Sequence, residues 1–162
     1  MNTLSPTLQS ICKITRPLWD KLVIALEALK NPALLIARMY VGWVFFASGL
    51  LKIQSWDTTI ELFTSEFQVP ILTKLSPTLA AVMGTGGELI LPVLLVFGLF
   101  GRFAALGLFV MNIVAVISLS EIAPAALQQH QFWGSLLAGL AIWGVGQWSV
   151  DSRLRGTDKR AP

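Results

Sequence analysis

Apolar runs long enough to cross a bilayer constrain this sequence more than any other feature. A transmembrane helix needs about 20 apolar residues at a rise of about 1.5 Å per residue. Four segments have about this length and few charges: residues 31–53, 77–100, 103–120 and 131–150. Only 13% of the 162 residues are charged and 54% are hydrophobic, whereas a soluble domain has about 25% charged residues. The sequence therefore predicts an all-α integral membrane protein with a four-helix bundle as its membrane domain, residues 31–150.

Two of the predicted spans begin with the same signal. Asn31-Pro32 and Ser76-Pro77 each place a capping side chain before a proline at the first helical position. Between the first two spans, residues 54–76 mix charged side chains with large apolar ones. This pattern predicts a short amphipathic helix and a loop outside the membrane.

The N-terminal segment, residues 1–30, has a helical pattern but not the unbroken apolar core of a signal peptide. Leucines recur there at spacings of three and four, which places them on one helical face: Leu18, Leu22, Leu26 and Leu29. We expect an uncleaved amphipathic helix. It either lies in the cytoplasmic headgroup layer, with Trp19 as an interfacial anchor, or packs against the bundle. The sequence favours both placements equally.

The lysines and arginines predict the orientation of the chain. Nine lie before the first span, in the tight turn at Arg102 or after the fourth span, and only two, Lys52 and Lys74, flank the other side. By the positive-inside rule both termini are cytoplasmic, including the basic tail, residues 151–162, and the loop 121–130 faces the opposite side. The net charge of +3 and the pI near 9.4 therefore reflect topology and do not indicate nucleic-acid binding.

Cysteine and histidine each occur once, as Cys12 and His130. One cysteine excludes an intramolecular disulfide and a dithiol redox pair. One histidine without a cysteine or histidine partner at ligand spacing argues against a structural zinc or a histidine-ligated haem, so we predict no metal site. We expect His130 to be an ordinary loop residue, with a proton relay at the outer surface as the alternative.

Glu88 is the polar residue that most favours a functional site. It lies about eleven residues from either end of its span, roughly 16 Å from both surfaces, so its side chain cannot reach the headgroups. A charged residue at such a depth costs roughly 2.5 to 3.5 kcal/mol in insertion experiments, and such residues are commonly functional. We therefore expect Glu88 to face the bundle interior.

Three further polar residues, Arg38, Asn112 and Lys52, complete a candidate ligand-binding cluster with Glu88. Arg38 is about six residues inside its span, and we expect it to pair with Glu88 unless it extends to lipid phosphates. Asn112 has nearly the depth of Glu88 and can hydrogen-bond it, whereas Lys52 is at a helix end, where interfacial exposure is the simpler reading. The structural alternative is that these groups only hold the helices together.

A family resemblance rests on several of these residues. Arg38 is followed four residues later by a glycine and then by Phe-x-x-x-Gly-x-x-Lys, which ends at Lys52. Gly87-Glu88 begins an apolar run that ends at Gly-Arg, and the last predicted span closes with small residues and a Ser-x-Asp stop at Asp151. Over residues 33–153 the chain resembles the DoxX family, apart from a longer N-terminal segment.

This resemblance implies a small four-helix protein of the bacterial inner membrane. Some members of the family are associated with quinone-linked sulfur oxidation or with redox and metal stress. Arg38, Lys52 and Glu88 are the positions that match the polar residues of the family.

Three functions remain open on these grounds. The first is a partner-binding or assembly subunit of a redox or stress-related membrane system. The second is the membrane subunit of a quinone-linked oxidoreductase, in which Arg38 or Lys52 donates to a quinone carbonyl, Glu88 exchanges protons and a partner supplies the electron cofactor. The third is a permease for a small solute or a lipid. Quinone is the one candidate cofactor, no catalytic residue is identified, and the expected partners are the bilayer and a protein partner or second copy.

Overall fold

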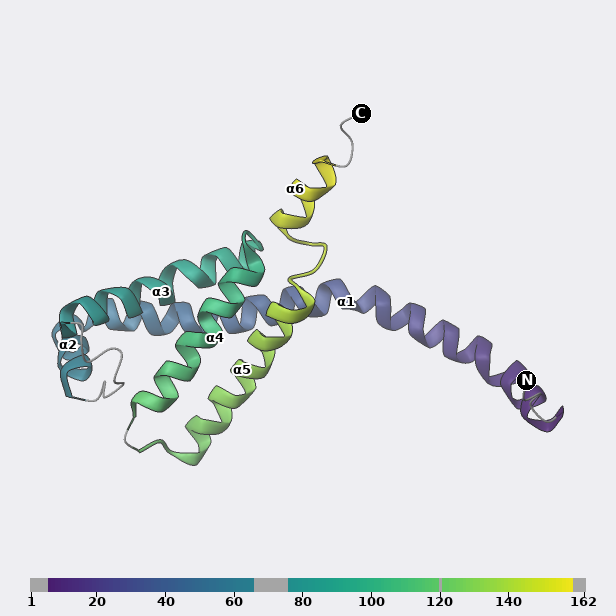
Figure 1. Cartoon of the computed structure of the whole chain (residues 1–162), viewed down its shortest axis with the longest axis horizontal. Helices are drawn as coiled ribbons and strands as arrows, with labels where there is room; N and C mark the ends of the chain where they lie inside the picture. Colours follow the sequence, from purple (N-terminus) through teal and green to yellow (C-terminus); the bar gives the residue numbers. More distant parts are fainter. Residues whose placement is uncertain (1–5, 66–75, 120, 159–162) are drawn as a thin grey trace.

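The computed structural model describes residues 6–65, 76–119 and 121–158, and the side chains between residues 15 and 156 within these ranges. This part of the chain contains no strand, which confirms the all-α fold (Figure 1). It forms these helices: α1 (Pro6–Gln54), α2 (Trp56–Ser65), α3 (Pro77–Phe97), α4 (Gly101–Ser118), α5 (Pro124–Trp143) and α6 (Val150–Asp158). Helix α2 confirms the short helix predicted after the first span.

Three stretches of helix are long and apolar enough to cross a membrane: Thr15–Gln54 of α1, α3 and α4. They confirm that the chain is a membrane protein with transmembrane helices. Helix α5 has 20 residues, but glutamines at 128, 129 and 131 and a histidine at 130 make its first half polar. Its crossing of the membrane, and with it the four-span topology, stays a prediction.

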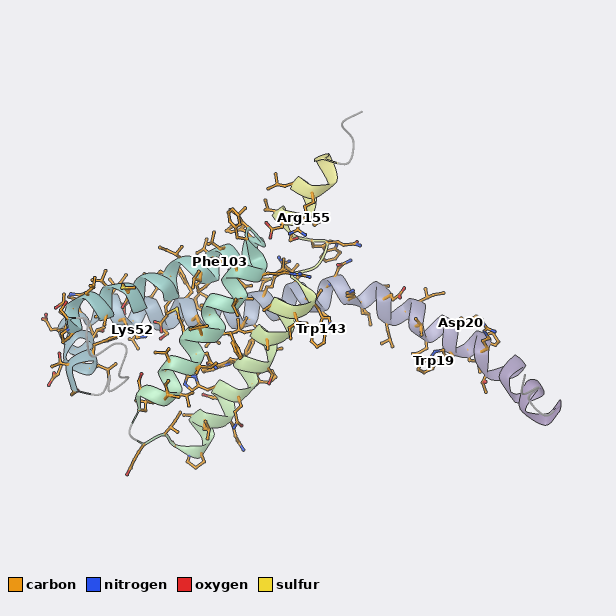
Figure 2. All side chains as sticks on the ribbon, in the orientation of Figure 1. Trp19, Asp20, Lys52, Phe103, Trp143 and Arg155 are labelled. Atoms are coloured by element: carbon orange, nitrogen blue, oxygen red, sulfur yellow. The ribbon has the colours of Figure 1, made fainter. Side chains whose placement is uncertain are left out.

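The N-terminal part of α1 projects away from the other helices (Figure 1). Its apolar side chains are exposed, including Leu18, Leu22 and Trp19, whose exposed fraction is 63% (Figure 2). In the described residues, the alternative that this segment packs against the bundle is therefore wrong. Because the segment continues the helix of the first span (Figure 1), its placement in the headgroup layer stays a prediction.

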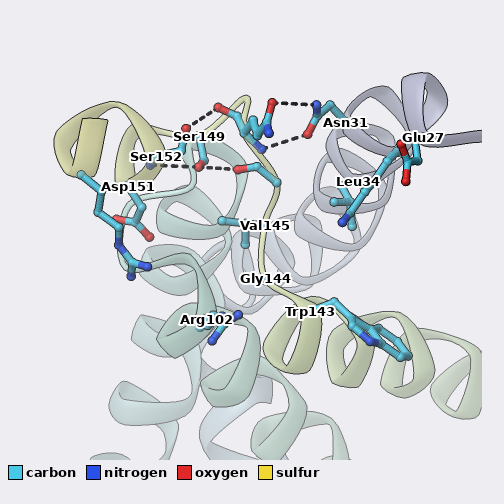
Figure 3. Close-up of a pocket in the computed structure, with 14 residues that line it drawn as sticks. Glu27, Asn31, Leu34, Arg102, Trp143, Gly144, Val145, Ser149, Asp151 and Ser152 are labelled. Carbon is cyan, nitrogen blue, oxygen red and sulfur yellow. Dashed lines mark hydrogen bonds between the residues drawn. The ribbon is translucent and has the colours of Figure 1, made fainter. Parts of the chain in front are cut away.

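Helix α1 continues unbroken through Pro17 and Pro32, so the prediction that a new helix begins at Asn31-Pro32 is wrong. The Asn31 side chain does not cap a helix. Its Oδ1 accepts a hydrogen bond from the backbone N–H of Gln147 at 3.0 Å, and its Nδ2 donates to Gln147 Oε1 at 3.4 Å (Figure 3). A proline removes its own N–H from the helical ladder, and this helix of 49 residues accommodates the loss.

Helices α3 and α4 form an antiparallel hairpin. The Ser76 hydroxyl accepts a hydrogen bond from Leu79 N–H at 3.3 Å and Pro77 follows at the first helical position, which confirms the predicted start of α3. The helix ends where Gly98 adopts a left-handed backbone with φ of 66°, and Phe100 has a positive φ as well. A tight turn therefore joins α3 and α4, but it lies at residues 98–100 and not at Arg102 as predicted, because Arg102 belongs to the first turn of α4. Helices α3 and α4 end two to three residues earlier than the predicted spans.

Helix α5 begins and ends seven residues before the predicted fourth span of residues 131–150. Its start is fixed by extended backbone at Ala123 followed by Pro124, and it ends at Gly144, whose φ is 90°. His130 consequently lies in the helix and not in a loop. Residues 144–149 form an irregular connection, here called the C-terminal loop, before α6 takes up most of the predicted basic tail.

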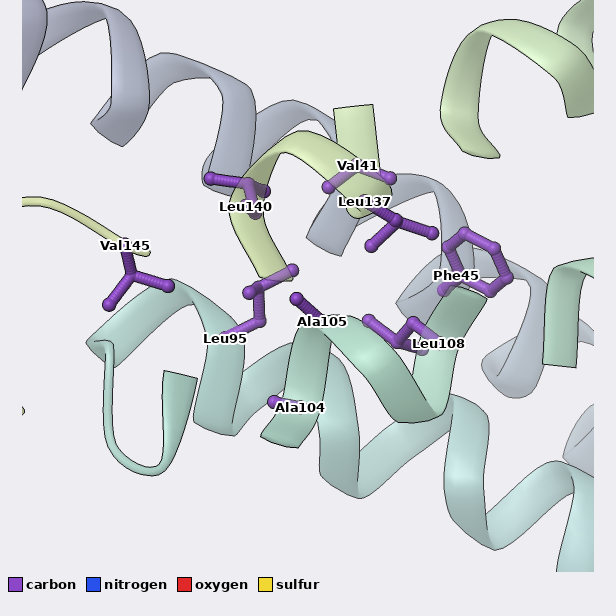
Figure 4. Close-up of a cluster of buried hydrophobic side chains, with 9 residues drawn as sticks. All are labelled: Val41, Phe45, Leu95, Ala104, Ala105, Leu108, Leu137, Leu140 and Val145. Atoms are coloured by element: carbon purple, nitrogen blue, oxygen red, sulfur yellow. The ribbon is translucent and has the colours of Figure 1, made fainter. Parts of the chain in front are cut away.

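The bundle core lies nearer the end formed by the C-terminal loop than the end formed by α2. It consists of interlocking apolar side chains from α1, α3, α4, α5 and the C-terminal loop (Figure 4): Val41, Phe45, Leu95, Ala104, Ala105, Leu108, Leu137, Leu140 and Val145. Phe63 of α2 packs separately on Ala80 and Ala81, which seats α2 on the start of α3. Between these two clusters the side chains leave a space.

Candidate functional site

This space is a cavity of about 860 Å³ near the α2 end of the bundle. Its walls come from α1 to α5 and are mainly apolar, with Phe45, Met111 and Trp133 among the larger side chains. The polar and charged groups that line it are Lys52, Glu88, His130 and two serines. A mostly apolar cavity with a few polar groups is typical of a site for a small amphiphilic ligand.

Lys52 and Glu88 form an ion pair across α1 and α3 at this cavity. The Lys52 Nζ lies 2.5 Å from Glu88 Oε1, and the two side chains are 22% and 11% exposed. The other carboxylate oxygen, Oε2, is buried and has no hydrogen-bond partner in the described residues. Glu88 therefore faces the interior as expected. One carboxylate oxygen is paired with Lys52, and the other can accept a hydrogen bond from a ligand.

Gly49 explains why the lysine reaches this carboxylate. A Cβ atom on Gly49 would lie 3.0 Å from the Leu89 side chain and 3.1 Å from the Glu88 Cβ. The missing side chain therefore lets α1 approach α3 closely at this level. Lys52 is one helical turn further along the same face, so its amine meets the Glu88 carboxylate.

The expected pair of Arg38 and Glu88 does not form. Arg38 is fully buried, and its Nη2 donates to the backbone carbonyl of Trp148 at 2.6 Å. Because Gly49 is level with Glu88, Arg38 lies about eleven residues or roughly 16 Å further along α1, well beyond the reach of its side chain. Estimating depth separately on each span missed this offset between the helices.

Arg38 instead joins α1 to the C-terminal loop. Its Nε and Nη1 are buried without a hydrogen-bond partner in the described part of the chain, and Gly98 lies directly against Nη1, where a Cβ atom would come within 2.5 Å. Asp151 fixes the other side of the loop by accepting hydrogen bonds from Phe100 N–H and Gly101 N–H at 2.9 and 2.8 Å. Arg38 therefore stabilises the contact between α1 and the C-terminal loop and does not line the cavity.

Asn112 also has a different partner from the one expected. Its Nδ2 donates to the His130 carbonyl at 2.9 Å, and its Oδ1 lies 2.8 Å from His130 Nδ1. Because the amide nitrogen is committed to a carbonyl, Oδ1 must accept from Nδ1–H, which leaves His130 Nε2 without a proton in the neutral ring. Trp133 packs edge-on against His130, with ring centroids 5.1 Å apart.

The predicted four-residue cluster is thus three separate interactions. Of the four predicted residues, only Lys52 and Glu88 line the cavity. His130, which was predicted to be an ordinary loop residue, lines it as well. The position of His130 inside a helix was missed because the fourth span was predicted to begin seven residues too late. Within the described ranges no group of three or more histidine, cysteine, aspartate or glutamate residues could hold a metal ion.

Transmembrane helices around a cavity with a buried ion pair define a helical membrane protein with a candidate intramembrane ligand site. Within this class the chain belongs to the DoxX family, whose family model matches residues 33–121, more than half of the sequence. The match contains Arg38, Lys52, Glu88 and Asn112 and ends before α5.

An uncharacterized protein of Haemophilus influenzae is similar to this chain, with 37% identity over 89 residues. The similar region covers 54% of this chain and 56% of the relative, so the match spans little more than half of either protein. No solved structure matches the chain. The comparisons therefore show the family of the chain and name no ligand.

Proposed function

We propose that this DoxX protein is the ligand-binding membrane subunit of a redox or stress-related system and that its ligand is a quinone. The observation that carries the proposal is the apolar cavity of about 860 Å³ with the Lys52–Glu88 pair in its wall. A quinone needs apolar space for its ring and tail and a donor for its carbonyl oxygen. This cavity offers both within one site.

The chemistry assigns separate roles to the polar residues. Lys52 would donate a hydrogen bond to a quinone carbonyl, and Glu88 Oε2, which has no partner in the described residues, would accept from the hydroxyl of the quinol. Reduction of a quinone to a quinol takes up two electrons and two protons. Glu88 and His130 would exchange the protons, and a partner protein would supply or accept the electrons.

The arrangement of the bundle supports four crossings with both termini on the cytoplasmic side. The contact between Asn31 and Gln147 brings the start of the first span and the chain after α5 to one end of the bundle, as an even number of crossings requires. In the sequence, nine of eleven membrane-flanking lysines and arginines precede the first span, lie at Arg102 or follow α5, which favours the cytoplasmic side of a bacterial inner membrane for these segments. The quinone cavity would then lie toward the outer side.

The packing favours binding over passage through the bundle. Leu95, Leu108 and Leu137 of the bundle core are fully buried, so the side chains of this core are closely packed. A permease would need a second conformation in which this core opens. A partner-binding subunit without a ligand is the second candidate, and the projecting, uncovered part of α1 favours it.

Binding of decylubiquinone to the purified protein tests the proposal. Ala115→Phe fills the cavity, which Ala115 lines, whereas Leu106→Phe adds an aromatic ring to the same helix at an exposed position outside the cavity. We expect saturable binding that Ala115→Phe abolishes and Leu106→Phe preserves, together with bound quinone in solvent extracts of the gently purified protein. Equal binding to both variants, or none to the wild type, would refute the quinone site.

A further inference from the structure

A second cavity, of about 560 Å³, lies at the opposite end of the bundle (Figure 3). Its walls are α1, the start of α4, the end of α5, the C-terminal loop and α6. Three basic residues from three separate helices line it: Lys30, Arg102 and Arg155. Chain segments far apart in sequence therefore bring positive charge together around one space.

The charges of this cavity are not balanced by the protein. None of the three basic side chains forms an ion pair in the part of the chain that the structure describes. Two acids, Glu27 and Asp151, also line the cavity, but both oxygens of Asp151 already accept backbone N–H groups. The lining therefore carries three cations against two carboxylates, a net positive charge, and the oxygens of one of these carboxylates are already engaged by backbone donors.

The backbone leaves room for one of these cations beside the C-terminal loop. Gly144 has a φ of 90°, and a Cβ atom there would lie 3.2 Å from Arg102 Nε and 3.4 Å from its Nη2. The absence of a side chain thus lets the guanidinium lie against the C-terminal loop. The loop itself is tied to α1 through the hydrogen bond from Gln147 N–H to Asn31, and Lys30 is the neighbour of Asn31 on that helix.

We propose that this cavity binds a phosphate group, carried by an anionic phospholipid. A guanidinium matches phosphate oxygens with paired donors, and a lysine ammonium adds a compact charge. The side chains of Leu34, Trp143 and Val145 give the cavity an apolar wall, and Trp143 is 75% exposed at the bundle end, as suits a residue at the lipid headgroups. This site is separate from the quinone cavity and does not depend on it.

Native mass spectrometry of the full-length protein with dioleoyl phosphatidylglycerol or dioleoyl phosphatidylcholine tests the site. We expect the protein to retain phosphatidylglycerol in preference to phosphatidylcholine. Arg102→Gln should lower the affinity for phosphatidylglycerol about 5-fold, since one basic residue near an anionic membrane contributes about 1 kcal/mol of binding free energy. Lys30→Gln should weaken retention similarly. Arg153→Gln is the matched control, because Arg153 is an exposed basic residue of α6 that does not line the cavity.

Glycerol 3-phosphate distinguishes a lipid from a free phosphate ester. Competition by millimolar glycerol 3-phosphate in the wild type, lost in Arg102→Gln, would show that the phosphate alone is recognised, whereas retention of lipid without competition assigns the lipid as the ligand. Unfolding midpoints of the variants verify that each is folded. Equal retention of both lipids, or equal effects of the substitutions at 102, 30 and 153, would overturn the proposal.

Discussion

Replacing Lys52 by methionine keeps most of the volume of the side chain but removes the charge that faces Glu88. The pair is short, at 2.5 Å, and its side chains are only 22% and 11% exposed. Loss of one partner from a buried pair costs about 3 to 5 kcal/mol, whereas replacing both by apolar groups is often nearly neutral. Because Lys52 is the more exposed partner and an unpaired carboxyl can take up a proton, we expect Lys52→Met to lower the free energy of unfolding by about 3 kcal/mol, the lower end of this range.

A double-mutant cycle isolates this interaction. We expect Glu88→Leu to lower the free energy of unfolding by about 3 kcal/mol as well. The loss in the double variant should be about 2 kcal/mol smaller than the sum of the two single losses. The free energy of unfolding of each variant is measured by titration with sodium dodecyl sulfate in mixed micelles. Losses that add to within about 0.5 kcal/mol would refute the buried pair, and with it the idea that Lys52 neutralises the cavity wall.

Other predictions concern the C-terminal loop, its turn and the topology. Arg38→Gln should lose the hydrogen bond to Trp148, a bond to a charged group worth about 1.5 to 3 kcal/mol, and limited proteolysis should then cut faster within residues 144–151. Gly98→Ala should destabilise the protein by more than about 1 kcal/mol, because φ is 66° and a Cβ atom would clash with Arg38 and Ser149. Gly86→Ala is its control in the same unfolding assay, since that position is open and alanine favours the helix by up to about 1 kcal/mol. Cys12 should react with a membrane-impermeant maleimide only after permeabilisation, and labelling of intact spheroplasts would contradict the cytoplasmic N-terminus.

The fold class could be predicted because lipid leaves few solutions for the backbone. Apolar runs of membrane length must form helices, and the cap at Ser76-Pro77 acts locally, so the start of α3 was predictable. A short connection to α4 was predictable as well, but the left-handed backbone of Gly98 places it before Arg102 and not at it. The C-terminal loop was not. Gly144 and Gly146 lie in an apolar context that resembles a span, and only their positive φ values reveal that α5 has ended.

The candidate site was predictable in its residue types but not in its pairings. A carboxyl at the middle of an apolar run signals an interior position whatever its partner is, and Glu88 is indeed buried. The partner depends on how far one helix is shifted along its neighbour, and single-helix depth carries no such information. Arg38 and Asn112 were therefore assigned to Glu88, although they bond to Trp148 and His130.

The spacing of Gly-x-x-Lys in the first span now has a physical explanation that connects it with Glu88. A Cβ atom on Gly49 would lie 3.1 Å from the Glu88 Cβ, so the glycine permits the close approach of α1 and α3 at this level, and the lysine three residues later lies on the same helical face. A bulkier residue at 49 would separate the helices, and the lysine would no longer reach the carboxylate. Gly49→Leu should therefore weaken the coupling between Lys52 and Glu88 as well as the stability itself, whereas a glycine needed only for packing would lower stability and leave the coupling energy unchanged.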